Sequence, residues 1–168
     1  QHMDFNRLFE VLEYQLHRFP QKTSLAGRLN GHWRTWGTAE ILAERDRVSA
    51  GLLKRGLRKG DHLGVLAHCG SPEWAIADAA MLQIGVIPVP IHATARPDEV
   101  AHITRDAALR GCFVSNGEML QKWDAAGADL EFVFSFDSSH SSALPWQELA
   151  CDPSPQELDK IRYIRDGI

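Results

Sequence analysis

The chain has 168 residues, of which 44% are hydrophobic and 24% are charged, as is typical of a globular domain. Its 18 Lys and Arg residues against 22 Asp and Glu residues give a net charge of −4, which argues against a nucleic-acid binder with a basic stripe. No apolar run approaches the roughly 18 residues that a membrane-spanning helix needs. No charged and then apolar leader opens the sequence, so nothing in it predicts secretion.

The three cysteines, Cys69, Cys112 and Cys151, are widely spaced and form no Cys-x-x-Cys pair. This pattern predicts neither a disulfide framework nor a zinc knuckle, and it fits a reducing cytoplasm. Residues 1–2 resemble a cloning remnant in front of a natural start at Met3, so we exclude them from the fold prediction.

The N-terminal third predicts a helix, a hairpin and a second helix. Apolar residues recur at helical spacing over 5–19, and Pro20 ends that helix. Asn30-Gly31 lies between two short strand-like runs, which is a strong hairpin signal because both turn positions need positive φ. Thr38 is the expected N-cap of the next helix, which ends near Gly56.

From residue 62 onward the sequence alternates strand and helix patterns. Ser71-Pro72-Glu73 is a clear helix start, with a capping hydroxyl, a proline at the first helical position and then an acid. The expected strands are 62–67, 86–91, 112–114 and 132–134, and the expected helices begin near 72, 97 and 117. Such alternation with short connections predicts right-handed βαβ units and a mainly parallel sheet flanked by helices. The fold class is therefore α/β, with an N-terminal helix and a β-hairpin.

After residue 136 the composition changes. A polar loop over 137–142 precedes a possible helical turn at 145–149, a proline-containing linker at 152–155 and a terminal helix over 156–165. We therefore divide the chain into an α/β subdomain over 3–136 and a segment of loop, linker and helix over 137–168.

The complete motifs of phosphate binding and hydrolysis are absent from the sequence. Gly51, Gly56 and Gly60 lack the following Lys-Ser or Lys-Thr of a phosphate loop, so their expected roles are helix interior, helix end and turn. No Gly-x-Gly-x-x-Gly, Gly-x-Ser-x-Gly or His-Glu-x-x-His occurs. One set of residues invites a metal interpretation, although its spacing matches no compact zinc pattern: His68, Cys69, His92, His102 and Cys112.

Five tryptophans are many for this length, and we expect them to join elements through buried area rather than to line a pocket. Trp74 is the strongest core candidate, ahead of Trp33, Trp36, Trp123 and Trp146. Asp78 and Asp106 are expected to be solvated or paired. On the residues alone, the chain is an α/β domain without a complete active site.

One ordered set of short motifs is more specific. It comprises Thr35-Trp36-Gly37-Thr38-Ala39-Glu40, Arg55-Gly56-Leu57-Arg58-Lys59-Gly60-Asp61, Leu63-Gly64-Val65-Leu66, Pro72-Glu73-Trp74, Pro88-Val89-Pro90-Ile91 and Pro97-Asp98-Glu99. This order resembles the N-terminal region of the AMP-forming acyl-CoA synthetases, over roughly residues 20–135. The Asn30-Gly31-His32-Trp33 run is most similar to the long-chain fatty acid branch. The chain departs from the family at His92-Ala93, where a Tyr-Pro pair is common, and at Arg96, where Ser or Thr is usual.

The resemblance implies a two-step ligase of fatty acid metabolism. A carboxylate attacks the α-phosphate of ATP to give acyl-adenylate and pyrophosphate, and the thiol of coenzyme A then displaces AMP. ATP, Mg²⁺ and coenzyme A are therefore implied for the parent protein. In the family, the phosphate loop and the later catalytic motifs lie beyond the region that this chain resembles.

We therefore interpret the chain as an N-terminal fragment that is inactive alone, and we assign it no catalytic, cofactor-binding or metal residue. Its expected partners are the rest of the parent chain and, through exposed apolar surface, other copies of itself. The loop from Pro90 to Pro97 follows the carboxyl end of a strand, so His92 and Thr94 are candidates to approach the parent's cleft, although ordinary loop packing is the more common role. The expected location is cytoplasmic. Peripheral membrane contact of the parent is possible, but no strongly basic amphipathic helix supports it.

Two alternatives stay open at this point. A free-standing flavodoxin-like binding or regulatory module would share the α/β pattern. A small nucleotide-binding enzyme would also share it, but the glycine fingerprint of such enzymes is missing.

Overall fold

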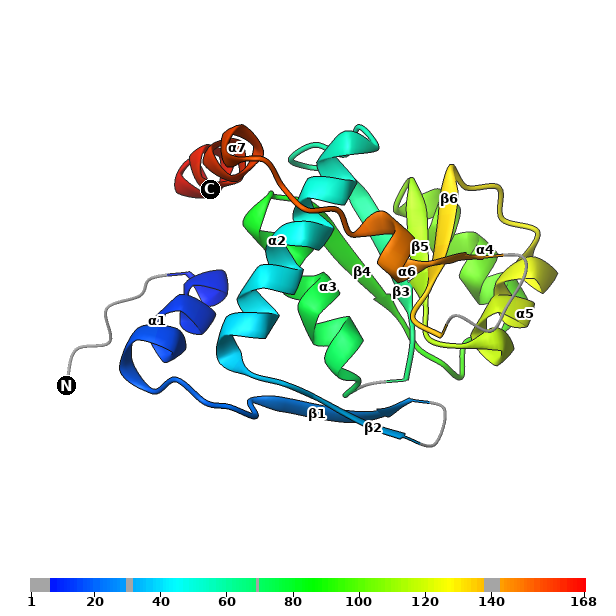
Figure 1. Cartoon of the computed structure of the whole chain (residues 1–168). Coiled ribbons are helices and arrows are strands. Elements are labelled where there is room, and N and C mark those ends of the chain that lie inside the picture. Colours follow the sequence, from blue (N-terminus) through cyan, green and yellow to red (C-terminus); the bar gives the residue numbers. More distant parts are fainter. Residues whose placement is uncertain (1–6, 30–31, 69, 138–142) are drawn as a thin grey trace.

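A computed structural model describes residues 7–29, 32–68, 70–137 and 143–168. At its centre is a parallel sheet of five strands in the order β4-β3-β5-β6-β7 (Figure 1). The strands are β3 (His62–Leu66), β4 (Ile87–Ile91), β5 (Gly111–Val114), β6 (Phe132–Ser135) and β7 (Leu144–Pro145). The predicted α/β class with a mainly parallel sheet is confirmed. The strand β7 was not expected, because two residues carry no periodic signal.

Helices cover both faces of this sheet. The first face carries α2 (Thr38–Lys54), α3 (Pro72–Gln83) and α6 (Trp146–Leu149), and the second carries α4 (Pro97–Asp106) and α5 (Gly117–Ala126). Side chains alternate between the faces along a strand. Accordingly Phe113 packs in the cluster under α2 and α3, whereas its neighbours Cys112 and Val114 pack in the cluster under α4 and α5.

Glycine is required where two elements of the first face meet. A methyl group on Gly51 of α2 would lie 1.8 Å from the carbonyl oxygen of Leu149 in α6. Trp146, Leu149 and Ile161 belong to the same buried cluster as the sheet and α2. The boundary that we place at residues 136 and 137 stays a prediction.

Outside the helices of the first face lie the N-terminal and C-terminal helices. They are η1 (Leu8–Glu10), α1 (Val11–Arg18) and α7 (Pro155–Asp166). The helix expected over 5–19 is thus a 3-10 turn followed by α1, and residues 5 and 6 lie outside the described residues. Phe9 is buried, while the residues of α1 itself are at most half-buried.

A polar network joins these two helices to α2 and α3. Glu13 Oε1 of α1 accepts hydrogen bonds from Arg45 Nη1 of α2 and from Arg165 Nη1 of α7, each at 2.7 Å. Arg45, only 3% exposed, also pairs with Asp46 at 2.9 Å. Gln83 of α3 donates to the same Asp46 carboxylate at 3.0 Å. One carboxylate oxygen therefore holds both the N-terminal and the C-terminal helix to the body of the protein.

The expected hairpin is present. Strand β1 (Leu25–Leu29) pairs antiparallel with β2 (His32–Trp36), with Leu25 opposite Trp36 and Leu29 opposite His32. The Asn30-Gly31 turn itself lies outside the described residues. The body-facing side of the hairpin approaches α3 closely, because a methyl group on Gly27 would lie 2.7 Å from the ring of Pro72.

The predicted start of α2 is off by one residue. Thr38 is the first helical residue, and Gly37 occupies the N-cap position. The Glu40 carboxylate accepts from the Gly37 N–H at 2.7 Å, and the Thr38 hydroxyl instead accepts from the Gln21 N–H at 3.2 Å. The start of α3 is as predicted, since Ser71 Oγ accepts from the Trp74 N–H at 3.1 Å.

The two prolines of β4 occupy the open edge of the sheet. The Ile87 N–H donates to the Asp61 carbonyl next to β3 at 2.8 Å. Because N–H groups alternate sides along a strand, Pro88 and Pro90 stand where an N–H would point away from β3. The prolines therefore remove no hydrogen bond between β3 and β4.

Candidate functional site

The carboxyl ends of the parallel strands form the candidate site. The chain enters the sheet at β3, adds β4 on one side and then crosses back to add β5 on the other side. Ligands of open α/β sheets bind outside the carboxyl ends of the strands near such a reversal. The segments at this edge follow β3 at His68, β4 at His92 and β5 at Ser115.

A small cavity of about 270 Å³ lies at this edge between the ends of β3 and β4. It is lined by Val65, Ala67, His68, Trp74, Pro90, Ile91, His92, Ala93 and Thr94. The residues with polar groups in this lining are His68, His92, Thr94 and Trp74, and the other lining residues are apolar. Such a mixture fits an apolar group that carries a hydrogen-bonding atom.

A larger open cavity of about 800 Å³ lies on the other side of the loop that follows β4. It shares Pro90, His92 and Thr94 with the small cavity. The structure thus places both predicted candidates, His92 and Thr94, in a wall between two cavities. Whether this wall faces the parent's cleft stays a prediction.

The rim of the larger cavity carries charge from the start of α4. Arg96 pairs with Asp98 at 3.1 Å, and the Glu99 carboxylate accepts from the Arg96 backbone N–H at 2.8 Å. Glu99 therefore supplies the carboxylate half of a capping box, while the Arg96 side chain makes no capping hydrogen bond of its own. The hydrogen bond from Arg96 holds the pKa of Asp98 below its usual range.

The loop between the cavities is fixed from two sides. The Ala95 N–H donates to the His92 carbonyl at 2.9 Å, which closes a turn. The Lys122 ammonium of α5 donates to the Ala93 carbonyl. The role of Lys122 is not visible in the sequence, because no local pattern joins residues 29 positions apart in the chain.

Trp74 differs from its expected role. It is only partly buried, and its ring lines the small cavity. Its indole N–H is shielded from solvent and has no hydrogen-bond partner among the described residues. The tryptophans fully inside the core are Trp36, Trp123 and Trp146, whereas Trp33 is 74% exposed. The expectation that Trp74 is the strongest core candidate is therefore wrong.

The set that invited a metal interpretation is not gathered in one place. Cys112 faces the cluster under α4 and α5, and burial raises the pKa of its thiol to about 12. His68 and His92 line the small cavity, His102 lines the larger one, and Cys69 lies outside the described residues. Within the described ranges, no three His, Cys, Asp or Glu side chains come together as metal ligands.

The three glycines have the roles predicted for them. Gly51 lies inside α2, Gly56 follows the end of α2 with φ +85°, and Gly60 occupies a turn with φ +92°. A left-handed backbone at the last two positions explains why glycine is used there. None of the three cradles a ligand cavity described above.

Comparison with known proteins supports the resemblance. A family model described as AMP-binding enzyme matches residues 12–164. The long chain acyl-CoA synthetase 7, peroxisomal, of Arabidopsis thaliana is 35% identical over 81 residues, which are 48% of this chain and 11% of that protein. The long-chain-fatty-acid–CoA ligase FadD15 of Mycobacterium bovis is 30% identical over 134 residues, which are 77% of this chain and 22% of that protein. The matched part of the chain thus spans about a tenth to a fifth of the length of these relatives.

Solved structures share the fold at low identity. A long-chain-fatty-acid-CoA ligase (FadD1) from Archaeoglobus fulgidus superposes with a TM-score of 0.73 at 18% identity, over 89% of this chain and 30% of that one. The anthranilate CoA ligase AuaEII, solved with anthranoyl-AMP, has a TM-score of 0.73 at 21% identity, over 94% of this chain and 32% of that one. At such identities the likeness concerns the fold. Together with the family match, it does not favour a free-standing flavodoxin-like module.

Proposed function

Because the chain belongs to the AMP-binding enzyme family, we propose that it forms the N-terminal part of an ATP-dependent fatty acid–CoA ligase. In the proposed reaction, a fatty acid carboxylate oxygen attacks the α-phosphate of ATP and pyrophosphate leaves. The thiolate of coenzyme A then attacks the acyl carbonyl, and AMP leaves. The adenylate step is needed because a free carboxylate is a poor electrophile.

The observation that carries this proposal is the family match over residues 12–164, nearly the whole chain. The match also extends beyond the motifs that carry the resemblance, since it covers most of α1 and most of α7. The fold agreement with two CoA ligases extends over about nine-tenths of the chain.

The proposal assigns different roles in the reaction to this chain and to the rest of the parent protein. In the part of the chain that the structure describes, the strand ends present cavities but no cluster of metal-ligating side chains. Adenylate chemistry needs groups that neutralise a triphosphate and a metal ion that polarises it. We therefore assign this chain a scaffolding role without catalysis of its own, and we assign ATP, Mg²⁺ and coenzyme A to sites completed by the rest of the parent.

Preference for long acyl chains is the finer part of the proposal. Several matched relatives are named long-chain enzymes, and one from Rattus norvegicus is named a medium-chain acyl-CoA ligase. A cytoplasmic location and self-association through exposed apolar side chains also belong to the proposal. Among the described residues, no helix has both the length and the hydrophobicity to cross a bilayer.

Calorimetric titration with ATP and Mg²⁺ tests whether this chain has only a scaffolding role. The 168-residue chain is expected to show no binding in the micromolar range, and micromolar affinity or acyl-CoA formation by this chain would overturn the scaffolding role. The activity of the parent is tested separately, by following pyrophosphate release and acyl-CoA formation by the longer protein. Hexadecanoate is expected to be a better substrate than octanoate, and no acyl-CoA from either acid would refute the ligase assignment.

A further inference from the structure

The distribution of charge along the chain is uneven. Residues 14–39 contain four Lys and Arg residues and not one Asp or Glu. The remaining residues hold 14 Lys and Arg residues against all 22 acids, a net charge of −8. A protein of net charge −4 therefore carries one positive segment, which comprises the end of α1, the hairpin, the connection between them and the start of α2.

This positive segment lies at the edge of the molecule that carries the candidate site. A methyl group on Gly27 of β1 would lie 2.7 Å from the ring of Pro72, the first residue of α3. Trp74, two residues further along α3, lines the small cavity at the ends of β3 and β4. In Figure 1 the hairpin runs beside the starts of α2 and α3. The positive segment therefore borders the candidate site.

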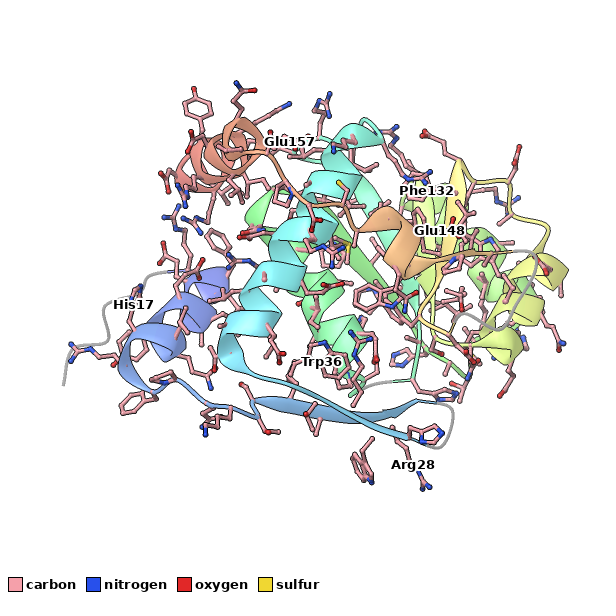
Figure 2. The ribbon with its side chains drawn as sticks, viewed as in Figure 1. His17, Arg28, Trp36, Phe132, Glu148 and Glu157 are labelled. Atoms are coloured by element: carbon pink, nitrogen blue, oxygen red, sulfur yellow. The ribbon has the colours of Figure 1, made fainter. Side chains whose placement is uncertain are left out.

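Two exposed cations of this segment are Lys22 and Arg34. Arg34 is paired with Gly27, and paired residues of antiparallel strands lie on the same face. The Arg34 Cζ atom lies 4.6 Å from the centroid of the Trp36 ring. Figure 2 shows Trp36 pointing toward the helices and Arg28 pointing away from the body. Arg34 thus lies on the face of the hairpin that approaches α3.

Two acids lie close to this segment, in the first turns of the adjoining helices. Glu40 follows the start of α2, and Glu73 follows the start of α3. The N-terminus of an α-helix carries a partial positive charge of about half a unit, which offsets part of the charge of each acid. The hairpin side of the edge therefore keeps an excess of positive charge.

The opposite side of the same edge has the reverse charge. At the rim of the larger cavity, the carboxylates of Asp98 and Glu99 stand against the single guanidinium group of Arg96. An anion that approaches the strand ends is therefore attracted on the hairpin side and repelled at the start of α4.

We propose that the positive segment over 14–39, with Lys22 and Arg34 as steering residues, guides anionic substrates to the carboxyl edge of the sheet. The identity of these anions rests on the proposed function, since fatty acid, ATP and coenzyme A all carry negative charge. The negative charge of the other residues repels the same anions, so productive encounters are concentrated at the hairpin. Such a field raises kcat/KM without contact with the reacting atoms, and added salt weakens it.

Fluorescence quenching of the 168-residue chain measures this field without any ligase reaction. Trp33 in the hairpin is 74% exposed, whereas Trp36, Trp123 and Trp146 are at most 3% exposed. The anion iodide is expected to quench Trp33 more strongly than the cation caesium, with neutral acrylamide as the reference. The double variant Lys22→Gln/Arg34→Gln is expected to lower the iodide quenching constant roughly twofold and to leave quenching by acrylamide unchanged.

Kinetics of the longer parent protein test the steering itself. At an ionic strength of about 0.02 M, Lys22→Gln/Arg34→Gln is expected to lower kcat/KM for ATP about threefold, with kcat unchanged. At about 0.5 M the difference from the unmodified protein is expected to vanish, because the field is screened within a few ångströms. The variant Lys22→Arg/Arg34→Lys keeps both charges and is expected to keep the unmodified kcat/KM.

A matched control separates this segment from general charge effects. The variant Lys160→Gln/Arg162→Gln removes two exposed cations of α7, which lies away from the hairpin in Figure 1, and is expected to behave like the unmodified protein. Circular dichroism checks that each variant is folded. The proposal is overturned by unchanged iodide quenching, by an unchanged kcat/KM in an active parent, by a loss that persists at high salt, or by an equal loss in the α7 variant. A parent that forms no acyl-CoA would instead refute the ligase assignment, and the quenching result alone would then decide whether the segment attracts anions.

Discussion

Gly51 lies directly against the carbonyl oxygen of Leu149, at a distance that leaves no room for a side chain on α2. We predict that Gly51→Ala destabilises the protein by about 1–3 kcal/mol, the usual cost of forcing extra volume into a packed contact. Alanine is the better helix former by up to about 1 kcal/mol, so the loss arises despite a favourable local term. Urea unfolding measures the change.

The control for this substitution is Gly167→Ala. Gly167 follows α7 with φ −91°, and a methyl group there would meet its nearest atom at 3.5 Å. This variant is expected to unfold at nearly the same urea concentration as the unmodified chain. Equal stability of the two variants would contradict the prediction, because it would mean that α6 moves away from α2 at little cost in free energy.

The shared carboxylate oxygen of Glu13 gives a second prediction. Glu13→Gln keeps the shape of the side chain but removes the charge that faces Arg45 and Arg165. Because Arg45 retains Asp46 as a partner, we expect a loss of about 1–2 kcal/mol, less than for a fully isolated buried charge. Hydrogen exchange is expected to become faster in α1 and in α7 together, while the central strands stay protected.

Asp159→Asn provides the comparison for Glu13. Asp159 pairs with Arg162 at 3.4 Å on the exposed side of α7, and exposed pairs contribute little. Exchange in α1 is expected to remain unchanged in this variant. If Glu13→Gln accelerated exchange in α1 alone, Arg165 would not depend on Glu13 for its position.

The ion pairs of Arg110 make the free energy of unfolding depend on pH in the acidic range. It pairs with Asp61 and with Glu131, each at 2.8 Å. The hydrogen bond from Arg110 lowers the pKa of Glu131. Burial alone would raise the pKa of Asp61, but the hydrogen bonds from the Arg58 backbone and from Arg110 outweigh it and lower that pKa.

Both carboxyl groups therefore bind protons less readily in the folded protein than in the unfolded chain. Their contribution is present above the unfolded values of about 4 and is lost as the pH falls through the lower folded values. We predict that Arg110→Gln flattens the decline in urea midpoint between pH 5 and pH 3. Arg162→Gln, at an exposed pair, is expected to keep the unmodified slope, and an unchanged slope in Arg110→Gln would contradict the prediction.

Asp78 has the opposite effect. It is half-buried in α3 without a partner among the described residues, and burial raises its pKa. The folded protein therefore holds this proton more tightly than the unfolded chain, so the ionised form at neutral pH opposes folding. Asp78→Asn is expected to raise the urea midpoint at pH 7, with the gain shrinking toward pH 3. Asp129→Asn, in an exposed loop, should show no such gain.

The periodic parts of the fold could be predicted from the sequence. The alternation of Phe132 and Phe134 with Val133, and the cap at Ser71, specify their elements through neighbours a few residues away. Trp74 could not be placed in this way, because α3 is apolar nearly all round and its sequence does not say which side faces the sheet. The strand β7 owes its form to pairing with β6, which a two-residue segment does not encode.

The candidate site was predictable to a similar degree. That His92 and Thr94 follow a strand end was visible from the sequence, and it placed them at the correct edge of the sheet. The division of that edge into two cavities depends on the path of the loop, which Lys122 fixes from a distant helix. Contacts of this kind arise only when the crossover connections are packed.

The prolines of β4 determine where this sheet is able to grow. An added strand could donate hydrogen bonds to the carbonyl oxygens of Pro88 and Pro90. It would receive none from these two residues, because proline has no backbone N–H, so about half of the usual hydrogen bonds between two strands would be missing. Chance pairing between molecules along β4 is thereby suppressed. Replacing both prolines would restore the outward amide groups of this edge strand, and β4 could then pair with another molecule and promote aggregation.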